Sequence, residues 1–201
     1  MTGFFMHCCK KINYPILSIF KLYLSILTFC VATAAWAASN GAYVKSAELV
    51  SRDENYLLNA DFDLAFSSEV EEALNKGVSL TFLVEFQLVS PRRYWFDDEI
   101  ITTTNRITLS YHALSRQYLL NRNNHQQSFA SLHEAKEELI HLHGWPVLDK
   151  SLLKKGEAYQ AALRIRLDQS KLPKPLQVEA LGSEDWKLVS EPFRWVPALS
   201  P

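Results

Sequence analysis

Strict alternation of apolar and polar side chains along residues 56–66 constrains the fold of this chain more than any other feature. The apolar positions are Leu58, Ala60, Phe62, Leu64 and Phe66. Asn59, Asp61 and Asp63 lie between them on the opposite face. A period of two places the two sets of side chains on opposite faces of an extended strand. The segment is therefore predicted to be a β-strand with one face in the core and one in solvent.

A second alternating run, residues 78–89, predicts a strand that is covered on both faces. Its main apolar face consists of Val78, Leu80, Phe82, Val84, Phe86 and Leu88. Leu83 and Val89 add apolar side chains to the opposite face, and Pro91 ends the run. Because a strand with two apolar faces is typical of the middle of a sheet, we expect this segment to have a neighbouring strand on each side.

Several further segments carry alternation or the β-branched and aromatic residues that favour strands. They are residues 47–52, 99–122, 159–167, 186–189 and 193–196. The first is expected to form a hairpin with residues 56–66 through the turn-forming residues 53–55. The run from residue 105 to 122 is too long for one straight strand in a domain of this size. Its alternation slips near His112, which predicts a corner or a bulge there.

The clearest helix is expected at residues 131–142. Its apolar residues recur on one helical face, and Ser131 with Glu134 has the spacing of a capping box. Gly144 and Pro146 are expected to end the helix, because glycine favours the left-handed conformation after a helix and proline cannot continue one.

The combination of seven or eight short strands with few helices favours a mainly β fold. We predict an antiparallel immunoglobulin-like β-sandwich with one amphipathic helix and a short helix at residues 68–76, capped by Ser67 or Ser68. The alternative is an α+β arrangement in which the helix packs on one face of an antiparallel sheet.

Residues 1–37 have the composition of an export signal. Three lysines flank or precede an apolar run at residues 22–31, and small residues follow it. A membrane helix needs about 20 apolar residues, so this run is too short for a stable bilayer span. We predict cleavage after Ala37 and release of residues 38–201 into the periplasm as a single globular domain.

The composition of the predicted exported domain excludes several functional classes. All three cysteines, Cys8, Cys9 and Cys30, lie upstream of it, so it has no thiol for a disulfide, a metal site or a nucleophile. Three of the 21 basic residues also lie upstream, which leaves 18 against 22 acidic residues, a formal charge of −4. Because proteins bind polyanions mainly through basic surfaces, we expect no nucleic-acid partner.

Two groups of arginines are candidates for a binding surface. The first group consists of Arg92, Arg93, Tyr94 and Trp95. Arginine beside aromatic residues is typical of protein interfaces. An alternative interpretation places this group in a strand, with its arginines paired to Asp61 or Asp63 across the sheet. The second group, Arg164 and Arg166, shares the polar face of a predicted strand and is expected to belong to the same charged surface.

The stretch SYHALSRQY, residues 110–118, concentrates polar and aromatic side chains at the predicted corner. We expect Tyr118 to be a core or corner aromatic. We expect His112 and Arg116 to line the bend and, with Tyr118, to contribute to the binding surface, because bulges re-aim side chains.

A hydrolase is the alternative function for the same stretch. In that hypothesis His112 activates Ser110 or Ser115 and is oriented by a distant acid such as Asp149 or Asp168. A triad requires direct hydrogen bonds from base to nucleophile and from base to acid, which this spacing does not by itself provide. We therefore predict a protein that is not an enzyme and has no catalytic residues.

The histidines of the exported domain do not have the spacing of a metal site. His133 and His141 are eight residues apart, about 12 Å along a helix axis, whereas helical metal ligands are three or four residues apart. His141 and His143 are instead expected to cap the C-terminal end of the helix. The chain also lacks a glycine-rich phosphate loop and a serine elbow, so we predict neither a metal nor a cofactor.

The order of several motifs is similar to that of a known family. They are PRRYWFDDEI, LSYHALSRQY, SFASLHEAKEEL, WPVLD, YQAALRIRLD, LPKPLQVEAL, DWKLVS and FRW, within residues 46–196. On these motifs the chain resembles the domain of unknown function 4390 family, exported proteins of Gram-negative bacteria. The resemblance implies a secreted or periplasmic single domain without an established activity or ligand. It also implies a pathway shared with an envelope sensor histidine kinase, since the genes of members often lie near one.

These observations together predict a non-catalytic binding or adaptor module with an envelope protein as its partner. The strand-rich architecture and the arginine and aromatic groups motivate this expectation. Besides the hydrolase, the second alternative is a carrier that holds a small hydrophobic ligand inside the sandwich.

Overall fold

Two long β-hairpins dominate the computed structural model, which describes residues 41–94 and 96–200. The strands of the described residues are β1 (Gly41–Arg52), β2 (Asn55–Ala65), β3 (Leu80–Ser90), β4 (Asp98–His112), β5 (Gln117–Arg122), β6 (His125–Phe129), β7 (His141–Asp149), β8 (Gln160–Leu167) and β9 (Phe193–Trp195). The helices are α2 (Ser68–Asn75), α3 (Leu132–Ile140) and α4 (Lys174–Ala180), with short 3-10 helices at Lys150–Leu152, Gln169–Lys171 and Glu184–Trp186. The predicted leader and its cleavage site lie outside the described residues, as does Trp95.

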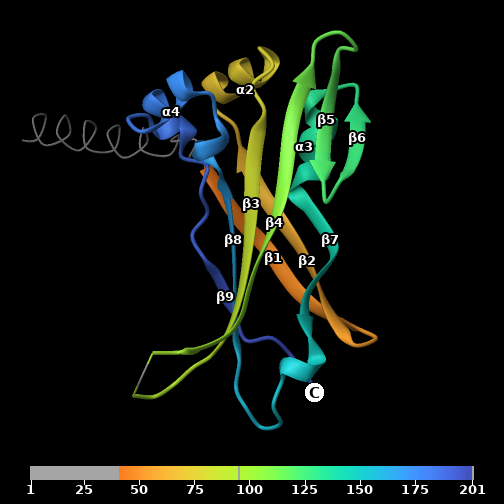
Figure 1. Ribbon diagram of the computed structural model, residues 1–201, viewed down its shortest axis with the longest axis vertical. Coiled ribbons are helices and arrows are strands. Elements are labelled where there is room, and N and C mark those ends of the chain that lie inside the picture. The colour runs from red at the N-terminus through yellow and green to blue at the C-terminus, as the bar shows by residue number, and fades with distance from the viewer. Residues whose placement is uncertain (1–40, 95, 201) are drawn as a thin grey trace, which may run out of the picture. The chain divides into compact units, whose positions relative to one another are not determined.

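The strands form two antiparallel sheets that lie one over the other. The smaller sheet has the order β1-β2-β7, and the larger has the order β6-β5-β4-β3-β8-β9. Figure 1 shows the β1–β2 hairpin crossing behind β3, β4 and β8. Every strand pair in both sheets is antiparallel, so the predicted antiparallel β-sandwich with helices is confirmed.

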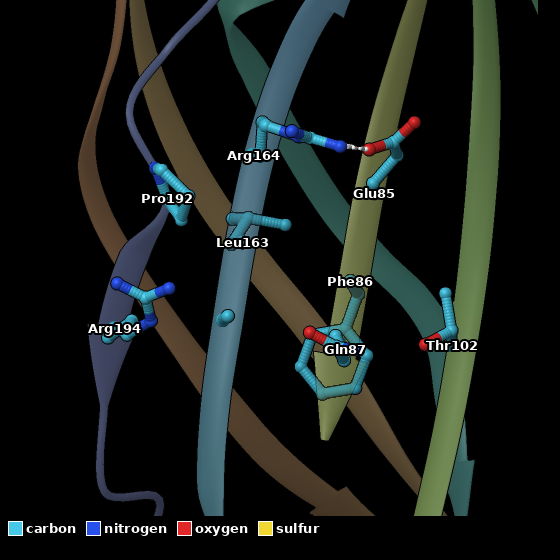
Figure 2. Close-up of a pocket in the computed structure, with 9 residues that line it drawn as sticks. Glu85, Phe86, Gln87, Thr102, Leu163, Arg164, Pro192 and Arg194 are labelled. Carbon is cyan, nitrogen blue, oxygen red and sulfur yellow. Dashed lines mark hydrogen bonds and ion pairs between the residues drawn. The ribbon is translucent and has the colours of Figure 1, made fainter. Parts of the chain in front are cut away.

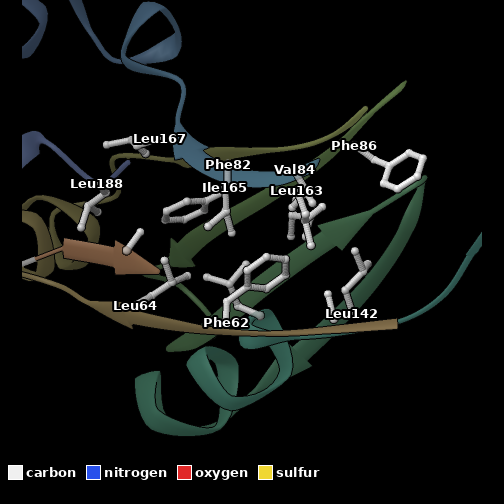
Figure 3. Packing of buried hydrophobic residues seen from close by; sticks show 14 of the residues in the cluster. Phe62, Leu64, Phe82, Val84, Phe86, Leu142, Leu163, Ile165, Leu167 and Leu188 are labelled. Carbon is white, nitrogen blue, oxygen red and sulfur yellow. The ribbon is translucent and has the colours of Figure 1, made fainter. Parts of the chain in front are cut away.

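The core lies between the two sheets and is built from the alternating side chains of their strands. From β2 the buried side chains include Leu58, Ala60, Phe62 and Leu64. From β3 and β8 they include Phe82, Val84, Phe86, Leu163 and Ile165 (Figure 3). Full burial of one large apolar side chain contributes about 1.5–3 kcal/mol, so this layer supplies much of the stability of the fold.

β3 is the central strand of the larger sheet, as its two apolar faces predicted. It pairs with β4 on one side and with β8 on the other. Leu83, on the face opposite the core, is only 7% exposed and lies in register between Arg106 and Arg166. The long aliphatic stems of arginine can cover such a side chain while their charged groups stay in water.

The helix predicted at residues 131–142 is present but ends earlier, at Ile140, and β7 follows at once. Ser131 caps α3 by accepting a hydrogen bond from the backbone N–H of Glu134 at 3.2 Å, as predicted. The prediction that Gly144 ends the helix is wrong. Gly144 has a φ of 66° and belongs to a bulge of β7, and its N–H donates to Asn59 Oδ1 at 2.9 Å. The bulge breaks the alternation of β7, which hid this strand in the sequence.

The corner predicted near His112 is a hairpin turn between β4 and β5. Tyr111 and Tyr118 are cross-strand partners, and their ring centroids are 4.9 Å apart. The four residues 113–116 form the turn, and Arg116 adopts the left-handed conformation with a φ of 54°. The shift in alternation therefore marks a change of strand and not a bulge within one strand.

The C-terminal segment departs most from the prediction. The strand expected at residues 186–189 is absent: Trp186 ends a 3-10 helix, and only Val189 forms a bridge, to Arg166. α4 was not predicted, although Pro173 and Pro175 stand where a helix begins and where proline is tolerated. The strand expected at residues 193–196 is confirmed as β9. None of the helices in the described part of the chain is long and apolar enough to cross a bilayer.

Candidate functional site

The residues predicted to form one binding surface lie in three separate places. Arg92, Arg93 and Tyr94 belong to the loop between β3 and β4, whereas the predicted His112, Arg116 and Tyr118 belong to the region of the β4–β5 turn. These two sites lie at opposite ends of β4, whose 15 residues span about 50 Å at 3.4 Å per residue. Arg164 and Arg166 lie on β8, away from both.

The β3–β4 loop is exposed, and the described residues of the loop do not form the strand of the alternative interpretation. The Arg92 guanidinium binds Asp98 Oδ2 at 2.6 Å, and the Arg92 backbone N–H donates to Asp97 Oδ1 at 3.2 Å. Tyr94 and Phe96 are 85% and 95% exposed. Turn contacts between neighbouring residues therefore replace the predicted pairing across the sheet with Asp61 or Asp63.

The β4–β5 turn contains the histidine and serine of the hydrolase hypothesis in direct contact. His112 Nδ1 lies 2.9 Å from Ser115 Oγ, and the Ser115 backbone N–H donates to the same nitrogen at 3.3 Å. The backbone donor makes Nδ1 an acceptor, so the contact closes an exposed turn. Among the described residues, neither Asp149 nor Asp168 forms a hydrogen bond with His112, and each instead accepts one from a backbone N–H of the 3-10 helix that it caps.

Tyr118, on β5 next to this turn, joins two elements of the fold. Its hydroxyl donates to Asn75 Oδ1 at 2.6 Å and so ties β5 to the end of α2. The residue is half-buried and packs against the core. Its position accounts for the predicted corner aromatic, and Asn75 takes the hydrogen of its hydroxyl group.

The third place, the outer face of the larger sheet, brings two arginines of β8 and a glutamate of β3 together. We use the term outer face for the side chains of β3, β4, β8 and β9 that point away from the core. Glu85, on β3, is paired in register with Arg164 on β8. Arg164 Nε donates to Glu85 Oε2 at 3.0 Å, and Arg166 Nε donates to Oε1 at 2.9 Å. Each carboxylate oxygen of Glu85 therefore binds one arginine (Figure 2 shows Glu85 and Arg164).

Burial and the two arginines shift the pKa of Glu85 in opposite directions. Its side chain is only 19% exposed, and burial alone would raise the pKa of the carboxyl group. The hydrogen bonds and charges of Arg164 and Arg166 outweigh burial, and the net pKa of Glu85 is lowered from its ordinary 4.5. Charge-assisted hydrogen bonds of this kind hold the carboxylate in its ionised form.

Replacement of Glu85 by glutamine should lower stability at neutral pH and much less in acid. We expect Glu85→Gln to reduce the free energy of unfolding by about 1–3 kcal/mol at pH 7, because two charge-assisted hydrogen bonds are lost. The pKa of the folded state is lowered, so the contribution of the carboxylate is present above the unfolded value of 4.5 and disappears as the pH falls through the folded value.

Urea unfolding of wild type and Glu85→Gln at pH 7 and pH 3 measures this difference. Glu54→Gln, at an exposed turn position, is the control and should change stability by less than about 0.5 kcal/mol. An equal difference between wild type and Glu85→Gln at both pH values would contradict the assignment of the ion pair.

A hollow of about 220 Å³ lies on the outer face beside this network. One row of residues in register crosses the sheet here: Thr102, Gln87, Ala162 and Arg194. Ala162 is the shortest side chain of the row, which leaves the space between Gln87 and Arg194 open. Pro192, which precedes β9, also lines the hollow.

Two arginines of the outer face have no partner within the described residues. Arg106 on β4 and Arg194 on β9 are exposed, and neither forms a hydrogen bond or ion pair with another described residue. Glu85 does not neutralise them, because both of its oxygens are bound by Arg164 and Arg166. The outer face therefore carries unpaired positive charge, although residues 38–201 have a net formal charge of −4.

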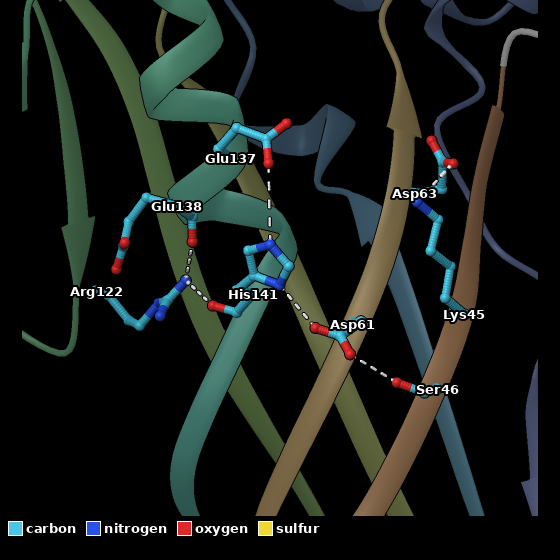
Figure 4. A network of polar contacts seen from close by, with 8 residues as sticks. All are labelled: Lys45, Ser46, Asp61, Asp63, Arg122, Glu137, Glu138 and His141. Atoms are coloured by element: carbon cyan, nitrogen blue, oxygen red, sulfur yellow. Dashed lines mark hydrogen bonds and ion pairs between the residues drawn. The ribbon is translucent and has the colours of Figure 1, made fainter.

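A second polar network lies on the smaller sheet around His141 (Figure 4). His141 Nδ1 is 2.7 Å from Asp61 Oδ1, and its Nε2 is 3.9 Å from a carboxylate oxygen of Glu137. Asp61 also accepts a hydrogen bond from Ser46 at 2.8 Å. The hydrogen bonds from His141 and Ser46 lower the pKa of Asp61. Among the described residues, no group of three or more histidine, cysteine, aspartate or glutamate side chains could hold a metal ion.

His141 is the C-cap residue of α3, as its predicted position at the helix end implied, but its side chain does not donate to the last carbonyl oxygens of the helix. Arg122 of β5 caps the C-terminal end of α3 instead, donating to the carbonyl oxygens of Glu138 and His141 at 3.0 and 3.1 Å. The His141 ring turns toward Asp61, and the His143 ring stacks on it at 6.1 Å. Because β7 begins directly after α3, both histidines belong to the strand. The His141 side chain therefore contacts the neighbouring strand β2 and not the end of the helix.

A comparison with family models identifies the family of this sequence. The model described as domain of unknown function (DUF4390) matches residues 39–196. The chain belongs to the DUF4390 family. No curated protein and no solved structure matches it.

The outer face of this DUF4390 protein could be found only in part from the sequence. Arg164 and Arg166 stood out because they alternate with buried residues on one strand. Glu85 was missed, although it is the only charged residue in β3. A single acidic side chain in a central strand is a usable signal for a cross-strand ion pair, because such a charge is rarely buried without a partner. Arg106 and Arg194 carried no such signal.

Proposed function

We propose that this DUF4390 protein is an exported, non-catalytic binding module that holds a segment of another envelope protein on its outer face. The observation that carries the proposal is the pair of unpaired arginines, Arg106 and Arg194, at the two sides of the Glu85 network. Unpaired charges of one sign on an otherwise oppositely charged protein favour a complementary partner surface.

The residue types of the outer face support binding to a protein. All of its basic residues named above are arginines, which are enriched in protein interfaces and form bidentate contacts with carboxylates. Threonine and glutamine fill much of the remaining surface, at Thr102, Thr104 and Gln87, and offer hydrogen bonds without bulk. The ion pairs of Glu85 hold Arg164 and Arg166 in place, which reduces the entropy that ordering these side chains would cost on binding.

The proposal includes a compartment and a pathway. The composition of residues 1–37 supports export to the periplasm, and the resemblance of the motifs to the family supports a pathway shared with an envelope sensor histidine kinase. The partner would then be an envelope protein with an acidic segment exposed to the periplasm.

Photo-crosslinking in the native envelope tests the proposed function. A photoreactive amino acid at Thr104, exposed on the outer face, should yield a specific crosslinked partner. The same amino acid at Val50, exposed on the smaller sheet, is the control and should not yield that partner. The double substitution Arg106→Glu and Arg194→Glu should abolish the crosslink at Thr104.

Two results would overturn the proposal. One is the same set of crosslinked products from positions 104 and 50. The other is a Thr104 crosslink that persists unchanged in the double arginine variant. Repeating the experiment in cells without the neighbouring sensor kinase shows whether the kinase is the crosslinked protein.

A further inference from the structure

We propose that the hollow between Arg164 and Arg194 is a subsite for one carboxylate of an acidic peptide segment. The inference rests on the proposed function and specifies the chemistry of the partner.

The shape of the hollow follows from the register of four strands. Ala162 lies between the longer Gln87 and Arg194 in one row, and Arg164 lies two residues farther along β8 on the same face. In Figure 2, Arg164, Gln87, Thr102 and Arg194 surround the space from four different strands. About 220 Å³ accommodates the end of an acidic side chain but not a large ligand, since small-molecule sites are usually about 300–1,000 Å³.

The polar groups around the hollow are mainly hydrogen-bond donors. Arg194 offers a complete guanidinium group, because it has no partner among the described residues. Thr102 adds a hydroxyl that can donate, and the Gln87 amide nitrogen, which donates one N–H to Glu99 Oε2 at 3.5 Å, has a second N–H to offer. Glu85 is the acid that lines the hollow, and Arg164 and Arg166 bind both of its oxygens. An anion is therefore the ligand that these groups can satisfy.

A carboxylate fits this site better than the phosphates of a polyanion. The chain itself binds a carboxylate next to the hollow, where Arg164 holds Glu85. A ligand carboxylate on Arg194 would repeat this contact in the row beside it. The net formal charge of −4 disfavours ligands with many phosphates, whose binding depends on extensive basic surface.

The edge of the sheet beside the hollow favours recognition through side chains and not through strand addition. β9 is only three residues long and lies between Pro192 and Pro197. Proline has no backbone N–H to donate, and short proline-flanked edge strands resist pairing with another strand. A bound segment would therefore lie over the outer face and insert an acidic side chain next to Arg194.

Titration of the exported protein with short peptides tests the inference. The probes are an acetylated and amidated tetraglutamate, the matching tetralysine, inorganic phosphate, and vesicles of anionic phospholipid. NMR resonances of the arginine Nε–H groups report binding at individual side chains. We expect tetraglutamate to shift the Arg194 resonance and tetralysine to leave it unchanged.

Two variants separate the subsite from general charge. Arg194→Gln removes the unpaired donor, and Ala162→Leu fills the hollow on an exposed strand face without changing charge. Each should weaken tetraglutamate binding at least tenfold, about 1.4 kcal/mol. Arg52→Gln removes an exposed arginine at the β1–β2 turn and should leave binding unchanged.

The outcomes distinguish the subsite from the proposed function. Failure of tetraglutamate to shift Arg194, with a Thr104 crosslink that still requires Arg106, would overturn the subsite and leave the binding module intact. A Thr104 crosslink that no longer depends on the two arginines would overturn the proposed function. Phosphate or anionic vesicles that bind as tightly as tetraglutamate, with the same sensitivity to Ala162→Leu, would replace the peptide by a free or lipid phosphate and overturn the inference.

Discussion

Replacement of Arg122 by alanine is expected to lower the free energy of unfolding by about 2–4 kcal/mol, because hydrogen bonds from a charged group are worth about 1.5–3 kcal/mol and the guanidinium is mostly removed from water. Arg122 donates to two carbonyl oxygens at the end of α3, those of Glu138 and His141. Desolvation lowers the pKa of Arg122, which agrees with its half-buried position. In the variant, both carbonyls lose their donor in a site that water reaches poorly.

Chemical denaturation at pH 7 measures this effect, and Arg52→Ala is the matched control. Arg52 is an exposed arginine without a partner among the described residues, so its loss should change stability by less than about 0.5 kcal/mol. Arg122→Lys should recover only part of the stability, because an ammonium group cannot copy the planar geometry of the guanidinium. Equal stability of Arg122→Ala and Arg52→Ala would show that the cap does not support the fold.

Replacement of Asn105 by leucine is expected to raise the free energy of unfolding by about 1–3 kcal/mol, the typical cost of a buried polar group without a hydrogen bond. Asn105 points into the core from β4, opposite Val84, and is 2% exposed. Neither its amide nitrogen nor its amide oxygen has a partner. Leucine has the same branching as asparagine and no polar atoms to desolvate.

The companion substitution Asn59→Leu should have the opposite effect on the free energy of unfolding. The Asn59 side chain donates to Glu48 Oε1 at 3.2 Å and accepts from the Gly144 N–H at 2.9 Å. Its removal is expected to lower the free energy of unfolding by about 0.5–1.5 kcal/mol per lost hydrogen bond. Urea unfolding of both variants gives the comparison. Destabilisation by Asn105→Leu and also by Asn105→Val, a smaller strand former, would refute the expected gain.

Regular alternation explains why some strands could be predicted and others could not. β2, β3 and β8 each bury every second side chain without interruption, so their period was visible in the sequence. β7 could not be recognised because its bulge at Gly144 moves the following residues to the other face. The prolines of the C-terminal segment suggested interrupted strands, whereas Pro173 and Pro175 in fact lie at the start of α4.

The candidate site depends on register, which a single sequence does not encode locally. Arg164 and Glu85 are 79 residues apart in the chain and meet only because β3 pairs with β8 in one particular alignment. A shift of one residue would turn Glu85 toward the core and separate it from both arginines. The polar face of β8 was therefore predictable, whereas its partner on β3 and the hollow beside Arg194 were not.

The central position of β3 has a consequence for how the protein reaches its native state. Phe82 pairs with Leu167, and Asn55 of the smaller sheet pairs with Asp149, so both sheets are completed only by segments far along the chain. Contacts of high sequence separation slow folding, because long loops must close before the contacts form. As the chain is made from its N-terminus, β3 can pair with β4 early but lacks its second partner until β8 follows. Such a topology delays completion of both sheets until the last third of the chain is available.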